Sequence, residues 1–189
     1  GGDLEDAIDF LRKKGLSVAE KKAGRVASQG LVGVVVEGTK GAIVELNSET
    51  DFVARNAEFQ AMLTKMLGAA LTANGDVETM KKEVVDGKTI EDGLTELIAK
   101  IGENMSLRRA SSVQVSNGVV VPYMHTAVVP NQGKIGVLVG LESQGDTAAL
   151  TELGKKIAMH IAASSPKFLA VEDVDADTLA HEKSIYEEQ

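Results

Sequence analysis

The chain of 189 residues contains no cysteine and no tryptophan, and it has only four phenylalanines, two tyrosines and three histidines. The absence of cysteine excludes a disulfide framework, a thiol nucleophile and a thiolate metal site, and it fits a reducing cytosol. No apolar run approaches the roughly 18 residues of a membrane-spanning helix. The histidines (His125, His160 and His181) are too far apart in sequence to form a metal-binding pair. Because a Gly-x-Ser-x-Gly motif is also missing, the sequence predicts no enzyme, metal site or cofactor.

The chain also lacks an excess of positive charge. Its 28 acidic residues against 20 lysines and arginines give a formal net charge of −8. Proteins that bind nucleic acid normally carry a basic excess, so this balance argues against direct contact with nucleic acid. Residues 12–25 are the locally basic exception, with six basic residues against Glu20. This stretch is either a solvated linker or an electrostatic contact with an acidic protein partner.

The composition is that of a globular protein, with 43% hydrophobic residues, and the length allows one or two subdomains. Apolar residues at three- and four-residue steps, preceded by capping residues, predict helices. The first has Leu4, Ala7, Ile8 and Leu11 on one stripe and is expected to end at Gly15. Residues 18–29 form a weaker helix or a linker. The other helices are predicted from Asn56 to Gly75, from Thr89 to Gly102, from Asp146 through Ala163 with Leu150, Leu153, Ile157 and Ile161 inside, and after Asp175.

Short runs rich in β-forming residues, separated by turn residues, predict strands. Gly38-Thr39-Lys40 and Ser116-Asn117-Gly118 each lie between two such runs, so both are predicted to be hairpin turns. Residues 128–133 are predicted to be a loop. The strands are predicted at 31–37, 41–47, 106–115, 119–126 and 134–141.

The predicted elements repeat. Hairpin, strand and long helix occur once in residues 31–73 and again in residues 119–163. The first unit places nine residues (48–56) before its long helix, whereas the second places only four (142–145). The extra stretch holds Asp51 and Phe52, an acid and one of the few aromatic residues, side by side. Because the shared fold does not need this corner, we expect it to have a function.

Two long motifs resemble those of the elongation factor Ts family, the nucleotide exchange factors of elongation factor Tu. The first is VELNSETDFVA at residues 44–54, and the second is IAMHIAASSPKF at residues 157–168. Residues 102–109 (GENMSLRR) are also similar, and the resemblance extends over essentially the whole chain. It implies a core of two related subdomains, with the chain beginning inside a small N-terminal helical module and stopping near the start of a C-terminal helical hairpin.

The expected fold class is therefore α+β, with two related α/β subdomains, each an antiparallel sheet packed against helices, preceded by a helical segment. The expected boundaries are 1–29 for the end of the helical module and linker, 30–104 and 105–172 for the two core subdomains, and 173–189 for the start of the C-terminal extension.

The resemblance also implies which residues contact the partner. Asp51 and Phe52 would protrude into elongation factor Tu near the magnesium and phosphate side of its nucleotide site, with Phe52 as a wedge and Asp51 as a hydrogen-bond acceptor. Thr50 and Val53 would position them. From the residues alone, Asp51 would complement the helix dipole and Phe52 would pack back onto its own sheet.

A second contact surface is implied at Met159 and His160, which lie off the predicted inner stripe of their helix. From the residues alone, His160 is an exposed or half-buried helix residue.

The sequence is thus identified as a member of a family of cytoplasmic guanine nucleotide exchange factors, acting on elongation factor Tu without touching nucleic acid or membrane. A bacterial source is expected, and a processed mitochondrial form stays open. Two alternatives remain. One is a module that holds elongation factor Tu without exchanging nucleotide, and the other is a small-molecule enzyme with a pocket between the repeats.

Overall fold

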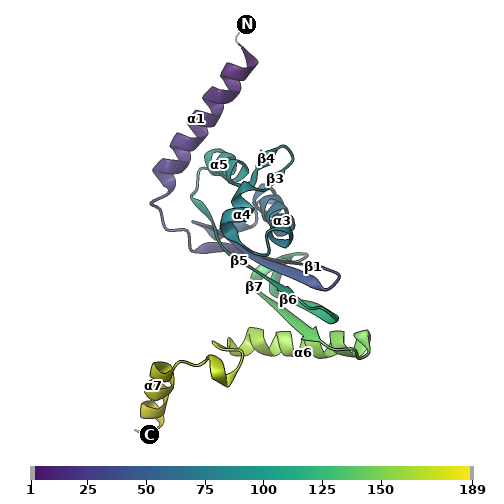
Figure 1. The fold of residues 1–189 in the computed structure, drawn as a ribbon. Coiled ribbons are helices and arrows are strands. Elements are labelled where there is room, and N and C mark those ends of the chain that lie inside the picture. The colour runs from purple at the N-terminus through teal and green to yellow at the C-terminus, as the bar shows by residue number, and fades with distance from the viewer. Residues whose placement is uncertain (1–2, 188–189) are drawn as a thin grey trace.

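The computed structural model describes residues 3–187, without the side chains of Leu4, Glu5 and Ala7, and its centre is a five-stranded antiparallel sheet (Figure 1). The strand order is β5-β2-β1-β7-β6, and a separate two-stranded hairpin, β3–β4, lies beside the helices. This arrangement of helices and antiparallel strands confirms the predicted α+β class. The strands are β1 (Gln29–Glu37), β2 (Lys40–Ser48), β3 (Val84–Val85), β4 (Lys88–Thr89), β5 (Met105–Gln114), β6 (Gly118–Val129) and β7 (Gln132–Glu142).

The sheet folds into two layers because β1 and β7 share only two residue pairs, Val32 with Gly133 and Gly33 with Gln132. Beyond this joint the β6–β7 hairpin lies across one face of the β5-β2-β1 layer. A Cβ added at Gly136 of β7 would lie 2.8 Å from Val32 Cγ1 and 3.1 Å from Ile43 Cδ1. Glycine is therefore needed there for the two layers to approach this closely.

Helices cover the outer face of each layer. In Figure 1, α3, α4 and α5 lie on one side of the strands and α6 lies on the other. The larger core is between α3 and the β5-β2-β1 layer, where Phe59, Leu63 and Met66 are fully buried. The helices are α1 (Leu4–Lys22), α2 (Asp51–Ala54), α3 (Ala57–Thr72), α4 (Val77–Lys82), α5 (Ile90–Ile101), α6 (Thr147–Ser164) and α7 (Ala176–Glu187), with a 3-10 turn at Val171–Asp173.

The predicted helix caps are confirmed where a short polar side chain precedes an apolar stripe. Asn56 accepts hydrogen bonds from the N–H groups of Glu58 and Phe59. Thr89, Asp146 and Asp175 each accept one from the residue three positions later. These bonds satisfy donors that the helix itself leaves free, so a local sequence signal fixes where each helix begins.

The prediction that the first helix ends at Gly15 is wrong, because α1 continues through this residue to Lys22. Gly15 is buried, and its ideal Cβ position lies 3.9 Å from Ala99 Cβ of α5. Packing against α5 thus offsets the roughly 1 kcal/mol that glycine costs in a helix interior. Of the predicted stripe, Ile8 and Leu11 are exposed, and the side chains of Leu4 and Ala7 lie outside the described part.

The predicted hairpin at Ser116-Asn117-Gly118 is wrong. β5 pairs with β2, and β6 pairs with β7, so the turn carries the chain from one layer to the other. Val115 and Val119, on either side of it, are both buried, and the N–H of Val115 donates to the carbonyl of Thr39 at 3.0 Å. The residues do form a turn, but the partner of each strand is set by contacts far away in the sequence.

The predicted loop at 128–133 is also wrong, since β6 runs to Val129 and β7 begins at Gln132. Only Pro130 and Asn131 separate them, and Asn131 has a φ of 64°. Asparagine tolerates this left-handed backbone, which lets two residues make the turn.

The predicted repeat is confirmed in its elements: the hairpin β1–β2 leads to α3, and the hairpin β6–β7 leads to α6. The inner stripe predicted for α6 is wrong at Leu153, which is 49% exposed, while Gly154 and Ala158 are the buried residues. Small residues allow α6 to lie directly on the hairpin, and this shifts its contact face by one position.

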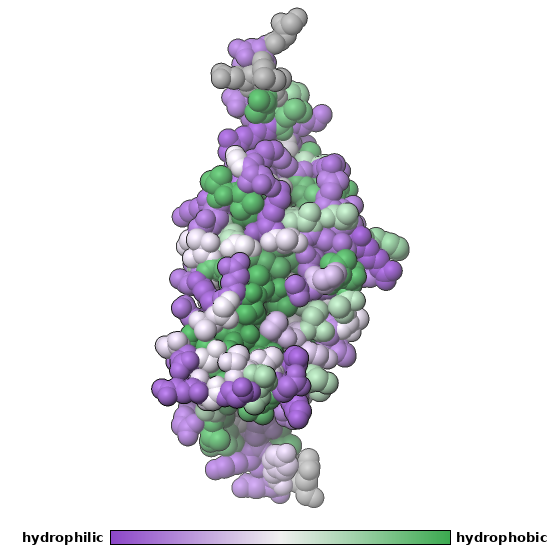
Figure 2. Space-filling model, turned by 90° about the vertical axis from the view of Figure 1, so that its right-hand side faces the viewer, coloured by the Kyte–Doolittle hydropathy of each residue, from purple (hydrophilic) through white to green (hydrophobic). Residues whose placement is uncertain are grey.

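The molecule is elongated, with α1 and α7 extending from opposite ends (Figure 1). On the side shown in Figure 2, apolar surface occupies the middle and polar side chains predominate around it. Within residues 3–187, no helix is both long enough and apolar enough to cross a membrane.

Candidate functional site

The corner between β2 and α3 (residues 49–53) exposes one large apolar side chain. Val53 and Ala54 of α2 are buried, whereas Phe52 is 87% exposed. Successive residues of a helical turn point about 100° apart, so burial of Val53 and Ala54 directs Phe52 outwards. The interpretation in which Phe52 packs back onto its own sheet is therefore wrong.

Thr50 holds the corner through hydrogen bonds to the segment after α5 and not as a helix cap. It occupies the N-cap position of α2, but its side chain makes no capping hydrogen bond. Instead, Thr50 Oγ1 donates to Glu103 Oε1 at 2.7 Å, and the Thr50 N–H donates to Glu103 Oε2 at 3.0 Å. Next to this pair, the N–H of Asn104 donates to Glu49 Oε1 at 2.6 Å. The segment after α5 thus fixes two consecutive residues of the corner.

Asp51 is held from the other unit of the repeat. Lys134 of β7 donates to Asp51 Oδ1 and, at 3.0 Å, to the carbonyl of Gly30. Arg55 Nε lies 3.7 Å from Asp51 Oδ2. The hydrogen bond from Lys134, then its charge and that of Arg55, lower the pKa of Asp51 below the ordinary value of 3.8.

Sequence reasoning missed Lys134, Glu103 and Asn104 as parts of this site. Residues 102–109 did stand out by their resemblance to the family, and they contain Glu103 and Asn104. Lys134 had no such signal, because it contacts Asp51 across 83 positions of the chain.

The two predicted contact surfaces belong to different units. Thr50, Asp51, Phe52 and Val53 lie together, on the stretch between β2 and α3. Met159, which is 54% exposed, and the exposed His160 lie on α6, which packs on the β6–β7 hairpin. The structure therefore presents two separate exposed surfaces, one following the end of β2 and one on α6.

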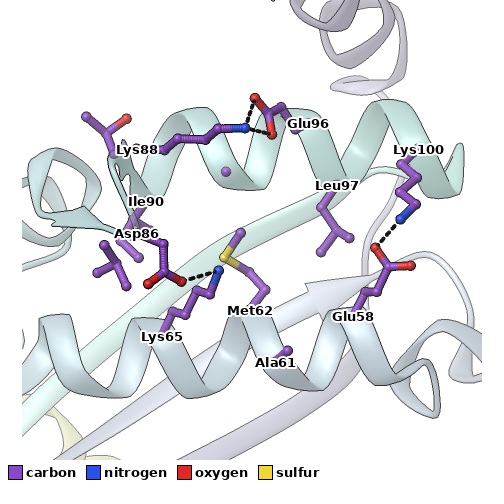
Figure 3. A pocket seen from close by; sticks show the side chains of 13 residues that line it. Glu58, Ala61, Met62, Lys65, Asp86, Lys88, Ile90, Glu96, Leu97 and Lys100 are labelled. Atoms are coloured by element: carbon purple, nitrogen blue, oxygen red, sulfur yellow. Dashed lines mark hydrogen bonds and ion pairs between the residues drawn. The ribbon is translucent and has the colours of Figure 1, made fainter.

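A further hollow of about 440 Å³ lies between α3, α5 and the β3–β4 hairpin (Figure 3). Met62, Ile90 and Leu97 contribute its apolar wall. Its charged residues form three ion pairs: Lys65–Asp86 at 2.9 Å, Lys88–Glu96 at 2.6 Å and Lys100–Glu58 at 2.6 Å. Each acid is neutralised by a lysine, so the hollow offers no free carboxylate. Across residues 3–187, no cluster of three or more His, Asp or Glu side chains is arranged to hold a metal ion.

The comparisons with known proteins agree with one another. The sequence model of a family described as "Elongation factor TS" matches residues 49–189. A Rhodospirillum rubrum protein named Elongation factor Ts is 54% identical over 191 residues, covering all of this chain and 62% of that protein. Proteins with the same name from Paramagnetospirillum magneticum and Bartonella bacilliformis are 55% and 46% identical over 190 residues, covering all of this chain and 61% and 62% of their own lengths. The chain thus spans about three fifths of the length of these curated relatives.

Proposed function

Because the chain belongs to the elongation factor Ts family, we propose that it binds elongation factor Tu and accelerates GDP release from it during translation elongation. The observation that carries this proposal is the Asp51-Phe52 corner, where an 87% exposed phenylalanine stands on a backbone fixed by Glu103, Asn104 and Lys134. Because the backbone that carries this side chain is already fixed, little backbone freedom is lost when a partner covers it.

In this proposal Phe52 enters between side chains of elongation factor Tu, near the magnesium and phosphate side of its nucleotide site. Asp51 accepts hydrogen bonds from partner donors. Lys134 and Arg55 already contact the Asp51 carboxylate, so a partner donor must either share this carboxylate with them or replace one of them. Thr50 and Val53 hold the corner, and Met159 and His160 form a second contact with another part of the partner.

The energies require more than one contact. Burying one phenylalanine contributes roughly 1.5–3 kcal/mol. A thousandfold faster nucleotide release requires the barrier to release to fall by about 4 kcal/mol when the factor is bound. Several contacts must therefore contribute. By linkage, bound GDP or GTP weakens the affinity of elongation factor Tu for this chain by the same ratio as this chain weakens its affinity for the nucleotide.

The mechanism needs no chemistry on the nucleotide, so the protein acts as an exchange factor and not as a hydrolase. We place this activity in the cytoplasm, without direct contact with nucleic acid or membrane.

The test is release of a fluorescent GDP from elongation factor Tu in the presence of excess unlabelled GDP. We expect fast release with the wild-type chain and release slowed at least about tenfold with Phe52→Ala, because an interface anchor of this kind contributes about 2 kcal/mol or more. Phe10→Ala is the matched control, since Phe10 is also an exposed phenylalanine, at 65%, on α1. Binding without faster release would leave only the holding module, and no binding at all would overturn the proposal.

A further inference from the structure

A groove runs beside the corner and is centred on one residue. Three adjoining hollows, of about 420, 130 and 350 Å³, all have Lys134 in their walls, and we name them together the Lys134 groove. At one end the groove passes Glu45 and Arg109 on the β5-β2-β1 layer. At the other end it reaches Asp51 and Arg55, next to Phe52.

The arginines along this groove are more exposed than the acids that they pair with. Arg109 Nε lies 2.6 Å from Glu45 Oε2, yet the Arg109 side chain is 78% exposed and that of Glu45 only 18%. Arg108 also approaches Glu45, at 3.7 Å, and is far more exposed than it. Arg55 is likewise more exposed than Asp51. The outward-facing charge is therefore positive, although the whole chain carries a net charge of −8.

The hollow in Figure 3 provides the contrast within the same molecule. Its lysines are not consistently more exposed than its acids: Lys88 and Glu96 are both 55% exposed, and Asp86, at 72%, is more exposed than its partner Lys65, at 42%. That hollow presents no dominant sign of charge to a partner. The positive sign of the Lys134 groove is thus a property of its particular arrangement and not of every ion-paired hollow on this surface.

The groove also has apolar walls. Val32, Ile43 and Ile135 line one end, and Val128 lines the other. Ile135 and Val128 are 43% and 39% exposed, so part of this apolar surface faces solvent. A complementary occupant would bring apolar side chains to the walls and carboxylates to the arginines at the rim.

We propose that the Lys134 groove is an interaction surface for an acidic, partly apolar segment of the partner protein, bound alongside Phe52. This inference rests on the proposed function, because the partner is then elongation factor Tu. A positive surface on an acidic molecule attracts an acidic partner in one orientation, which raises the association rate and selects the face that meets it. The partly exposed apolar side chains of Ile135 and Val128 in the walls favour a protein segment over a nucleic acid in the same groove.

The test is the association rate constant with nucleotide-free elongation factor Tu, measured by stopped flow at about 20 and 200 mM salt. The variant is Arg108→Gln/Arg109→Gln. In this variant Glu45 loses both arginines but still accepts the hydrogen bond from the Asn47 side chain, at 3.1 Å. The control is Lys88→Gln, because Lys88 is an exposed lysine that pairs with Glu96, at 2.6 Å, in the other hollow and away from the groove. Thermal unfolding of all three proteins verifies that they are folded.

We expect the double variant to associate roughly three- to tenfold more slowly at low salt, with a smaller difference at high salt, and Lys88→Gln to match the wild type. Should the double variant be unstable, Arg55→Gln tests the other end of the groove. Equal rates and salt dependence for groove and control variants would overturn the inference while leaving exchange by the wild type intact. Binding of a 12-nucleotide single strand that is abolished in the double variant would instead assign the groove to nucleic acid. Failure of the wild type to bind elongation factor Tu would overturn the proposed function itself.

Discussion

Glu103 determines the position of the corner although it lies 53 positions away in the sequence. Its carboxylate accepts two hydrogen bonds from Thr50, one from the hydroxyl and one from the backbone N–H. Removal of the carboxylate leaves both half-buried donors without their partner, which costs about 1–3 kcal/mol.

We therefore predict that Glu103→Ala lowers the free energy of unfolding by about 1–3 kcal/mol and slows nucleotide exchange, and that Glu103→Gln, which keeps one acceptor, has a smaller effect. Chemical denaturation and the GDP-release assay measure the two changes. Glu96→Ala is the control, because Glu96 is a surface partner of Lys88 and such pairs contribute only about 0–1 kcal/mol. Equal losses for Glu103→Ala and Glu96→Ala would contradict this role.

The titration of Asp51 reports the contact with Lys134. Since the folded-state pKa is lowered, first by the hydrogen bond from Lys134, the contact stabilises the fold above the ordinary pKa of 3.8. That contribution disappears as the pH falls through the lower folded-state pKa. Near neutral pH it is fully present.

We predict that carbon NMR of the Asp51 carboxyl gives a pKa below 3.8 in the wild type and a higher pKa in Lys134→Met, with Lys134→Arg close to the wild type. Arg55 is the other charged group that lowers this pKa, so Arg55→Met should produce a smaller upward shift. An unchanged pKa in Lys134→Met would show that Lys134 does not hold Asp51 in solution.

At the scale of elements, the 18-residue helix α6 has a glycine, Gly154, in its interior, where alanine would be the better helix former. A Cβ on Gly154 would lie 2.5 Å from Val121 Cγ2, so the helix would have to move away from the hairpin. Gly68 in α3 is the opposite case, because nothing lies within 4 Å of its ideal Cβ position.

We predict that Gly154→Ala lowers the free energy of unfolding by about 1–3 kcal/mol through overpacking. The matched control, Gly68→Ala, should raise it by about 0.5–1 kcal/mol, because alanine is the better helix former. Urea denaturation measures both. A gain of stability in both variants would mean that α6 packs more loosely than the structure has it.

The elements also separate what the sequence could predict from what it could not. Asn56, Thr89, Asp146 and Asp175 mark helix starts because each bonds within its own first turn. The Ser116-Asn117-Gly118 turn looks like a hairpin for equally local reasons, yet β5 finds its partner in β2, more than 50 residues earlier. In the site, the comparison of the two repeats and the family resemblance singled out Phe52, whereas the Lys134 and Glu103 contacts depend on how distant segments meet.

At the scale of the whole molecule, the two layers are held at one spacing by glycines. Gly136 lies against both Val32 and Ile43 of the facing layer. The layers in turn carry the two exposed surfaces, with the corner on the first and Met159 on the second.

We predict that Gly136→Ala weakens binding to elongation factor Tu roughly severalfold, although Gly136 is in neither surface, because it changes the separation of two simultaneous contacts. Gly24→Ala is the control, as no atom lies within 4 Å of its ideal Cβ position. A dissociation constant measured by calorimetry decides the outcome, and equal affinities in the two variants would contradict the prediction.

If both proposed surfaces bind the partner, the interlocked packing of the two layers makes the chain a rigid bivalent ligand. Joined by only two residue pairs between β1 and β7, the layers could rotate about this joint, but their close packing at Gly136 prevents the rotation. With the spacing of the two surfaces fixed, binding at the first surface brings the second surface close to its own site on the partner. The effective concentration for this second contact is high when the partner's geometry matches and near zero when it does not. A conformational change that alters the distance between the two recognition sites on the partner would therefore release the factor as a unit, because neither surface could stay bound for long without the other.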